Sequence, residues 1–365
     1  MISKKSIFLL FLSSVLFTLV FFAISMKTIE NSDIEDVYPA RIVIGKDELS
    51  CHYKQGKEQL KDISDVVLNE NRRKIFFLET SCKSYNAKRI VISTRQACAV
   101  ESAARMNPNM DVYVLYASTG GFREGNEESD RYLKLLKSYP NLHILHFDVQ
   151  RFVKNTPVET LWTSGLMNQS HYPMVHTSDI LRLLVLWRYG GIYLDLDVVV
   201  LKSLETFPDN FAGAQSIDVL ANGVMGFSKE GKGHEYVEKC LENAMETFNG
   251  SDWAYNGPHL ITRVFNKICP YNSTKLLIHK GRCEEFYIYS PEKFYLVPWK
   301  QWYWFFDKDL NDLIQRFADK ESYLVHLWNK LSFNTTVPKD DTDVPYLDLA
   351  RQYCPGVVEE IDEYF

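Results

Sequence analysis

The sequence predicts an α/β fold built on a parallel, Rossmann-like sheet. Short apolar runs at residues 75–78, 112–116 and 142–147 are typical of buried parallel strands, and stretches of helical composition, such as residues 96–106, separate them. Strands that alternate with helices in this way favour βαβ units. The chain has 365 residues and is 46% hydrophobic, which is the composition of a globular protein with a sizeable core.

The first 27 residues indicate a membrane anchor. Residues 7–26 carry no charge, with Lys4 and Lys5 before them and Lys27 after them. Twenty helical residues span about 30 Å, the thickness of the bilayer hydrocarbon. We expect a signal anchor at residues 7–26 behind a cytoplasmic tail of residues 1–6, because basic residues stay on the cytoplasmic side. A cleaved signal peptide is the alternative, since its apolar region is usually about 7–15 residues long.

The rest of the chain would then lie in the secretory lumen. Residues 27–70 are rich in charge and poor in aromatic residues, and we expect them to form a stem before a folded domain of residues 71–365. The net charge of −6, with no block of Lys and Arg, argues against nucleic acid as a partner. Sequons agree with a luminal location. The predicted glycosylation sites are Asn168, Asn249, Asn272 and Asn334.

The cysteines form no CxxC motif and no Cys/His cluster with the spacing of a zinc site, so disulfides in an oxidising lumen are expected. Cys82 and Cys98 are 16 residues apart between a strand and a helix, and we predict a bond between them. We also predict a bond between Cys269 and Cys283, which are 14 residues apart around a sequon. The pairing of the other cysteines stays open. They are Cys51, Cys240 and Cys354.

A charged pair lies in a helix that should be buried. We expect this helix to begin near Thr177 or Ser178, and it is apolar nearly all round. Asp179 and Arg182 are three residues apart and share one face of it. Burying such a pair is costly without a purpose or excellent pairing. The sequence leaves two interpretations open, a functional pair or a local ion pair at the start of a helix.

Two aspartates close the next strand. Gly190 and Gly191 end the helix, and the strand that follows finishes in Asp195-Leu196-Asp197. Strand alternation predicts that both carboxylates lie on one face, where they repel each other unless a cation sits between them. Replacing either aspartate by asparagine should therefore leave folding nearly intact. Such oxygen ligands suit Mn²⁺ or Mg²⁺ carrying phosphate oxygens, and the carboxyl end of a strand is where open α/β sheets bind ligands.

These residues are similar to the sugar-binding DXD region of type II Golgi glycosyltransferases. From residue 75 to about residue 355 the chain resembles the family of α-1,4-galactosyltransferases and α-1,4-N-acetylglucosaminyltransferases, the Gb3 synthase-like family. The quoted motif is Ser178-Asp179-x-x-Arg182 followed by Gly190-Gly191-Ile192-Tyr193-Leu194-Asp195-Leu196-Asp197. Further matching segments are residues 75–81, 95–105, 257–265, 298–299 and 325–330.

The resemblance implies a GT-A fold, with a donor-binding part to about residue 230 and an acceptor-holding part from about residue 231. It implies a Golgi enzyme, single-pass type II with a luminal catalytic domain, that uses a UDP-sugar. That enzyme would transfer galactose or an N-acetylhexosamine to a glycosphingolipid such as lactosylceramide, with retention of anomeric configuration. Asp195 and Asp197 match the catalytic DXD that holds the diphosphate through Mn²⁺ or Mg²⁺. Asp179 and Arg182 match a pair that contacts hydroxyls of the donor sugar.

Other residues are candidates for the same site. Glu79 and Thr80 follow the first strand, where a nucleotide contact competes with an ordinary loop position. The sequence Asn222-Gly223 between two apolar runs predicts a hairpin-like turn that could reach the donor sugar. His326 follows a predicted last core strand and could be a third metal ligand or a diphosphate contact, or instead a packing residue.

Two alternatives to the galactosyltransferase hypothesis remain. One is a DXD mannosyltransferase that uses a GDP-sugar, and the other is a catalytically silent luminal protein that binds carbohydrate. The presence of both DXD aspartates and of the Asp179/Arg182 pair argues against a silent protein. The aromatic cluster between residues 299 and 306 could bind an acceptor, although most such clusters belong to a core.

Overall fold

The computed structural model describes residues 49–54, 59–271 and 273–365. The predicted tail, the anchor at residues 7–26, residues 27–48 and 55–58 of the stem and the sequon asparagine Asn272 lie outside these residues. In the part of the chain that is described, no helix combines the length and the apolar character needed to cross a bilayer.

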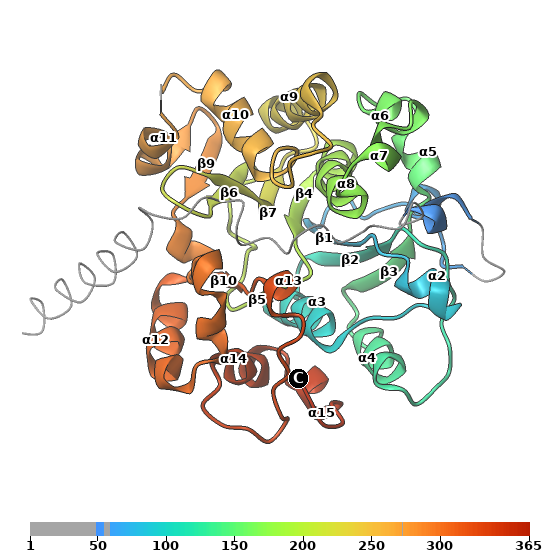
Figure 1. Cartoon of the computed structure of the whole chain (residues 1–365), viewed down its shortest axis with the longest axis vertical. Coiled ribbons are helices and arrows are strands. Elements are labelled where there is room, and N and C mark those ends of the chain that lie inside the picture. The colour runs from blue at the N-terminus through green and yellow to red at the C-terminus, as the bar shows by residue number, and fades with distance from the viewer. Residues whose placement is uncertain (1–48, 55–58, 272) are drawn as a thin grey trace, which may run out of the picture. The chain divides into compact units, whose positions relative to one another are not determined.

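Within these residues, eight strands form one mixed sheet in the order β3-β2-β1-β4-β7-β6-β9-β8 (Figure 1). The neighbours among β1 to β4 are parallel, whereas β7 pairs antiparallel with both β4 and β6. The predicted α/β class and the three predicted strands are confirmed. The strands are β1 (Lys74–Glu79), β2 (Asp111–Tyr116), β3 (Leu142–His146), β4 (Gly191–Leu194), β6 (Phe211–Ala214), β7 (Leu220–Phe227), β8 (Arg282–Cys283) and β9 (Phe286–Tyr289).

A second, two-stranded sheet lies beside the first. It pairs β5 (Val198–Val200) with β10 (Leu324–His326) in antiparallel register, which places His326 opposite Val198. The predicted last core strand is confirmed, and it ends one residue later than expected because His326 is itself part of the ladder. The pairing therefore places His326, from the C-terminal part of the chain, beside Val198, the residue that follows the Asp195–Asp197 turn.

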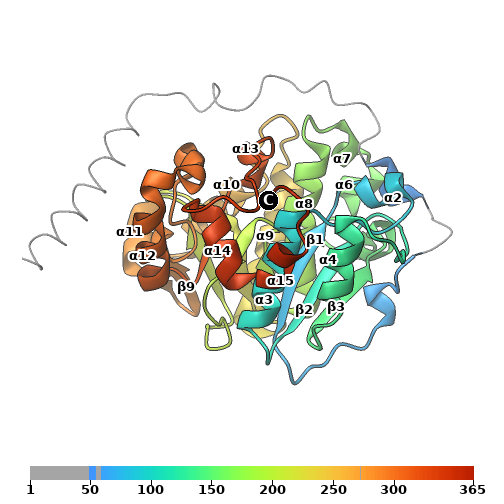
Figure 2. The same ribbon diagram turned by 90° about the horizontal axis from the view of Figure 1, so that it is seen from below.

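Helices cover both faces of the large sheet (Figures 1 and 2). Residues of α3, α4, α12, α14 and α15 belong to the core on one face, and residues of α5 to α11 belong to the core on the other. The α-helices are α2 (Lys83–Ala87), α3 (Thr94–Met106), α4 (Glu128–Leu136), α5 (Val149–Val153), α6 (Glu159–Thr163), α7 (Leu166–Gln169), α8 (Pro173–Tyr189), α9 (Gly231–Thr247), α10 (Pro258–Ile268), α11 (Thr274–Lys280), α12 (Asn311–Glu321), α13 (Asn329–Ser332), α14 (Pro345–Tyr353) and α15 (Pro355–Glu359). The 3-10 helices are η2 (Ser50–Tyr53), η3 (Ile63–Asp65), η4 (Pro291–Lys293), η5 (Trp299–Phe306) and η6 (Lys308–Leu310).

Strand β1 shows why these runs are apolar without alternation. Ile75 and Phe77 pack into the core on the side of α3, while Phe76 and Leu78 pack into the core on the side of α8. A strand covered on both faces by helices has no solvent side, so the four positions between Lys74 and Glu79 are all apolar.

Helix α8 begins earlier than predicted. Its first residue is Pro173, so neither Thr177 nor Ser178 caps it. Proline suits the first turn because its fixed φ is helical and the missing N–H has no partner to lose there. As a result Asp179 lies in the second turn, buried inside the domain rather than at a helix end.

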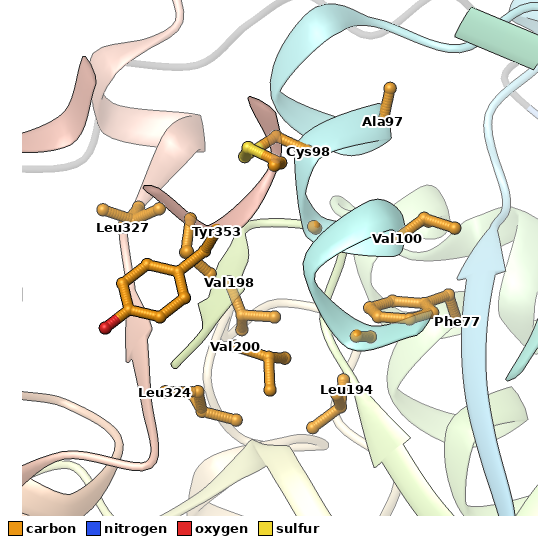
Figure 3. Packing of buried hydrophobic residues seen from close by; sticks show 14 of the residues in the cluster. Phe77, Ala97, Cys98, Val100, Leu194, Val198, Val200, Leu324, Leu327 and Tyr353 are labelled. Carbon is orange, nitrogen blue, oxygen red and sulfur yellow. A yellow bond between two sulfur atoms is a disulfide. The ribbon is translucent and has the colours of Figure 1, made fainter. Parts of the chain in front are cut away.

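The disulfides differ from the prediction in one pair. In the described residues the bonds are Cys51–Cys82, Cys98–Cys354 and Cys269–Cys283, and Cys240 is free and buried. The Cys269–Cys283 prediction is confirmed and the Cys82–Cys98 prediction is wrong. Cys98 faces the core on α3, among apolar side chains of β5 and of the segment after β10, where the junction of α14 and α15 brings Cys354 (Figure 3).

Candidate active site

The two aspartates lie in the turn that joins β4 to β5. Strand β4 ends at Leu194, so the predicted placement of both carboxylates on one face of a strand is wrong. The backbone N–H of Asp195 donates to the carbonyl of Gly223 at 2.8 Å, and the carbonyl of Asp197 accepts from the N–H of Leu327 at 2.9 Å. One backbone bond thus ties the turn to β7, and the other ties it to the segment that follows β10.

The turn brings both carboxylates to His326. Its Nε2 lies 3.0 Å from Asp197 Oδ1 and 3.5 Å from Asp195 Oδ2. Burial opposes protonation of His326, but the two carboxylates outweigh it and raise its pKa to about 9. One ligand atom from each of the three side chains lies within 4.8 Å of the others. Two carboxylates and an imidazole form a donor set that suits a divalent metal, as the sequence predicted.

Aromatic rings hold His326 in place. The ring centroids of Trp328 and Tyr295 lie 4.3 Å and 5.2 Å from that of His326. Trp328 has a φ of 53°, and its indole N–H donates to the carbonyl of Val297 at 2.8 Å. A tryptophan in the left-handed region is rare, and the indole bond and the packing of the ring stabilise it there.

The hydroxyl of Tyr295 lies close to the DXD turn. It is buried and has no hydrogen-bond partner among the described residues. A Cβ at Gly223 would lie 2.5 Å from Asp195 Oδ2 and 3.2 Å from this hydroxyl, so glycine is the residue that leaves room for both. The unpartnered hydroxyl is therefore a polar group available at the site.

A buried arginine holds Asp195. Nη1 of Arg182 lies 3.0 Å from Asp195 Oδ1 and donates to the carbonyl of Asn222 at 3.1 Å. Tyr193 also donates to Asp195 Oδ1, at 2.7 Å. Burial alone would raise the pKa of Asp195, but the Arg182 guanidinium, His326 and the Tyr193 hydroxyl together outweigh it and lower the pKa. Asp195 is thus held ionised and oriented by side chains that come before and after it in the chain.

Asp179 lies on the other side of Arg182. Its Oδ1 is 3.5 Å from Arg182 Nη2 and accepts from the Asn222 amide at 2.7 Å. Its Oδ2 is buried and has no partner in the described part of the chain. Burial raises the pKa of Asp179 in spite of the arginine. The free oxygen could accept a hydrogen bond from a ligand hydroxyl.

Asn222 and Gly223 are not a hairpin turn. They lie inside β7, a central strand of the large sheet, so that prediction is wrong. The polar Asn222 tolerates this position because its amide and carbonyl pair with Asp179 and Arg182. The structure therefore brings the predicted sugar-binding residues and the predicted metal ligands together, with Arg182 contacting both sets.

Glu79 and Thr80 lie at the carboxyl end of β1, where the sequence placed them. Both carboxylate oxygens of Glu79 already have partners, since Oε1 accepts from the N–H of Ser81 at 2.7 Å and Oε2 accepts from the Gln96 amide at 2.5 Å. The carbonyl of Thr80 is bonded to His52 Nε2 at 2.7 Å. These bonds give Glu79 and Thr80 a structural role whether or not a nucleotide binds there.

Ser118 and Thr119 are further candidates, which sequence reasoning did not single out. They follow β2, the neighbour of β1, and their buried hydroxyls have no partners in the described residues. Their position after a second parallel strand was the signal that could have found them.

The predicted aromatic cluster lies in η5. Most of η5 is partly exposed, with Tyr303 at 51%, so the cluster does not belong wholly to the core. Among the predicted glycosylation sites, Asn168 and Asn334 are exposed and Asn249 is half-buried.

Two family descriptions match this chain. "Glycosyltransferase sugar-binding region containing DXD motif" matches residues 93–216, and "Alpha 1,4-glycosyltransferase conserved region" matches residues 229–361. The first range contains Asp179, Arg182 and both aspartates of the turn, and the second contains His326.

Curated relatives match over most of their length. The lactosylceramide 4-alpha-galactosyltransferase of Gorilla gorilla gorilla is 34% identical over 294 residues, which are 80% of this chain and 84% of the relative. The human protein of the same name is 33% identical over 292 residues, which are 80% of this chain and 78% of the relative. The human alpha-1,4-N-acetylglucosaminyltransferase is 27% identical over 297 residues, which are 81% of this chain and 82% of the relative.

Proposed function

The chain belongs to the alpha 1,4-glycosyltransferase family, and on this premise we propose that it transfers galactose from UDP-galactose to a glycosphingolipid such as lactosylceramide. The transfer would retain the α configuration of the sugar. An N-acetylhexosamine is the other donor sugar to consider, because one relative is named for that transfer. The proposal rests on one observation. Arg182 contacts both the Asp195–Asp197–His326 cluster, through Asp195, and the Asp179–Asn222 pair, through Asp179.

The cluster of Asp195, Asp197 and His326 fits a divalent cation. Its ligands would be Asp195, Asp197 and His326, and the mixed oxygen and nitrogen set favours Mn²⁺ over Mg²⁺, which prefers oxygen ligands alone. When bound, such an ion neutralises the charge that develops on a departing UDP diphosphate.

The remaining residues would bind and orient the donor. Asp179 would accept a hydrogen bond from a sugar hydroxyl through its unpartnered Oδ2, while the Asn222 amide fixes the orientation of the carboxylate. Arg182 would keep Asp195 ionised and in place. With the sugar fixed between these groups and the diphosphate, its anomeric carbon can reach the oxocarbenium-like state through which glycosyl transfer passes.

We also propose how the substrates are placed. Glu79 and Thr80 lie at the carboxyl end of β1, which favours a nucleotide contact at this edge of a GT-A fold. The partly exposed aromatic residues of η5 would contact the acceptor. An anchor at residues 7–26 would hold the enzyme in the Golgi membrane with its catalytic domain in the lumen, alongside a lipid acceptor.

The test uses the full chain, purified in detergent with Mn²⁺. It is incubated with UDP-galactose, UDP-GalNAc, UDP-GlcNAc and GDP-mannose, each with and without lactosylceramide, and the linkage of any product is determined by NMR. We expect an α-1,4-linked hexose on lactosylceramide from a UDP-sugar and no product from the matched Asp197→Asn variant. Transfer from GDP-mannose alone would favour the mannosyltransferase alternative. No transfer and no UDP binding would favour the silent carbohydrate-binding protein.

A further inference from the structure

The short helix α13 supports Asp197, one of the three candidate metal ligands. The backbone N–H of Asn329, its first residue, donates to Asp197 Oδ2 at 3.1 Å. Just before it, the N–H of Leu327 donates to the carbonyl of Asp197 at 2.9 Å. A helix of four residues is not stable by itself, so other contacts must hold it where these bonds can form.

Arg95, in the first turn of α3, makes those contacts. Its Nη1 donates to the carbonyl and to the hydroxyl of Ser332, at 3.1 Å and 3.2 Å, and its Nη2 donates to the carbonyl of Thr335. Three aromatic rings surround the guanidinium. They are Phe306, Tyr346 and Phe365, with centroids 5.2, 5.3 and 5.7 Å from Arg95 Cζ.

No carboxylate of the described residues lies within ion-pair distance of Arg95, so its charge is balanced by carbonyl oxygens and ring faces. Two carbonyls that diverge from one side chain need the planar fork of a guanidinium, and a lysine ammonium on a longer, flexible stem would hold at most one of them well. The chemistry of the position is therefore specific to arginine.

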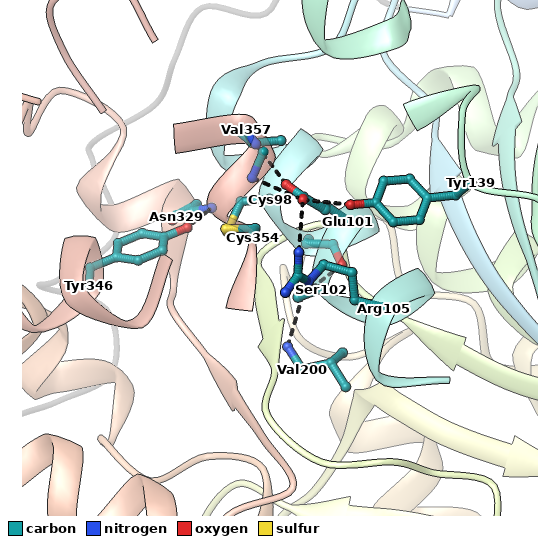
Figure 4. The surroundings of a disulfide bond; sticks show 12 residues. Cys98, Glu101, Ser102, Arg105, Tyr139, Val200, Asn329, Tyr346, Cys354 and Val357 are labelled. Atoms are coloured by element: carbon teal, nitrogen blue, oxygen red, sulfur yellow. Dashed lines mark hydrogen bonds and ion pairs between the residues drawn. A yellow bond between two sulfur atoms is a disulfide. The ribbon is translucent and has the colours of Figure 1, made fainter. Parts of the chain in front are cut away.

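A second route leads from Arg95 to the same turn. The ring of Tyr346 lies against the guanidinium, and its hydroxyl lies 3.3 Å from Nδ2 of Asn329. Figure 4 shows Asn329 and Tyr346 facing each other beside the Cys98–Cys354 disulfide. Arg95 thus contacts the last residue of α13, Ser332, directly, and reaches the side chain of the first residue of α13, Asn329, through Tyr346.

We propose that Arg95 is a positioning residue, which fastens α13 so that Asn329 keeps the Asp197 carboxylate in line with Asp195 and His326. The geometry of this fastening is independent of the reaction, and only its consequence for Mn²⁺ and UDP rests on the proposed function. Arg95 would not touch the substrate.

The experiment compares the full-length wild-type chain with Arg95→Lys and with a matched control, Arg73→Lys. Arg73 also fastens a loop through carbonyl oxygens, those of Leu204, Glu205 and Phe207, but contacts none of the candidate site residues. Three quantities are measured: amide hydrogen exchange of peptides that cover residues 327–335, Mn²⁺-dependent UDP binding by calorimetry, and the melting temperature. Tyr346→Phe is a milder second variant, since it removes only the hydroxyl that reaches Asn329.

We expect Arg95→Lys to speed exchange in residues 327–335 about tenfold or more and to weaken Mn²⁺-dependent UDP binding roughly tenfold, as the loss of a group that orients a metal ligand does. Tyr346→Phe should act in the same direction with a smaller effect. Arg73→Lys should change neither quantity, even where its melting temperature falls as far.

The outcomes separate the two proposals. Unchanged exchange in residues 327–335 of both Arg95→Lys and Tyr346→Phe would overturn the positioning role. If the wild-type chain binds UDP, an Arg95→Lys variant with the same UDP affinity would overturn it too. If the wild-type chain binds neither Mn²⁺ nor UDP, the proposed function fails, and the exchange of residues 327–335 alone decides whether Arg95 fastens α13.

Discussion

The two DXD aspartates should differ in what they contribute to stability. From the sequence they are equivalent members of a repelling pair, and either substitution by asparagine should spare the fold. The structure changes this expectation for Asp195, which is the nearest anion to the buried Arg182 at 3.0 Å. Asp197 instead faces His326 and the N–H of Asn329. We predict that Asp195→Asn destabilises the metal-free protein more than Asp197→Asn does, because the arginine left behind keeps its charge, whereas His326 can lose its proton.

The magnitude follows from the burial of the pair. Removing one partner of a fully buried ion pair costs about 3–5 kcal/mol, because the other charge stays buried. The Arg182 side chain is 8% exposed and that of Asp195 is 24% exposed, and Arg182 keeps Asp179 at 3.5 Å. We therefore expect a loss of about 2 kcal/mol. With an unfolding entropy of about 2.1 cal/mol/K per residue, a domain of about 300 residues would melt about 3 °C lower.

The assay is thermal unfolding of the metal-free wild-type chain and of both variants, followed by transfer assays with Mn²⁺ and donor. Both variants should lose transfer, but Asp195→Asn should melt lower than Asp197→Asn. In a double-mutant cycle with Arg182→Gln, the free energies of Asp195→Asn and Arg182→Gln should fail to add by about 2 kcal/mol, because both changes remove the same interaction. Equal melting temperatures for the two DXD variants, or additive free energies in the cycle, would refute the reasoning.

Other consequences can be measured separately. Gly223→Ala places a Cβ 2.5 Å from Asp195 Oδ2 and should weaken Mn²⁺-dependent UDP binding about tenfold or more; a calorimetric affinity equal to that of the wild type would contradict this. Replacing Cys98 and Cys354 together by serine opens a bond across 256 residues and should cost about 5 kcal/mol in urea unfolding, a prediction that a loss below about 1 kcal/mol would contradict. Burial lowers the pKa of His176 from 6.5, so the folded state binds fewer protons than the unfolded one, and the stability due to this neutral histidine is complete above pH 6.5 and lost as the pH falls below it. The free energy of unfolding of His176→Gln should therefore fall less steeply than that of the wild type between about pH 7 and pH 5, by up to about 1.4 kcal/mol per pH unit, and parallel curves of this free energy against pH would count against the assignment.

Local patterns predicted the parts of the fold that depend on local burial. The strands were visible because β1 and β2 are buried on both faces and so contain apolar runs. The carboxylates of the DXD turn were visible because they directly follow such a strand. His326 was found in the same way, as the end of a short apolar strand, and its approach to the turn follows from the pairing of β10 with β5.

Contacts between distant segments explain the predictions that failed. Cys98 and Cys354 are 256 residues apart, so no spacing could indicate their bond. Asn222 has the local signature of a turn, and it lies in a central strand only because Asp179 and Arg182 satisfy its polar groups there. In each case the deciding partner belongs to another element, and a rule that uses neighbours in the sequence cannot include it.

The same distinction explains how the candidate site is assembled. Asp195 is held by groups from the region of the DXD match and by β7, namely Arg182, Tyr193 and the carbonyl of Gly223. Asp197 is held by the segment from β10 to α13, which belongs to the second matched region. The two carboxylates are only two residues apart in the sequence, yet their positions depend on different parts of the chain. We therefore expect Asp195, Asp197 and His326 to come together only when the C-terminal part is packed against α3, and metal binding to depend on the packing that Arg95 and the Cys98–Cys354 bond maintain.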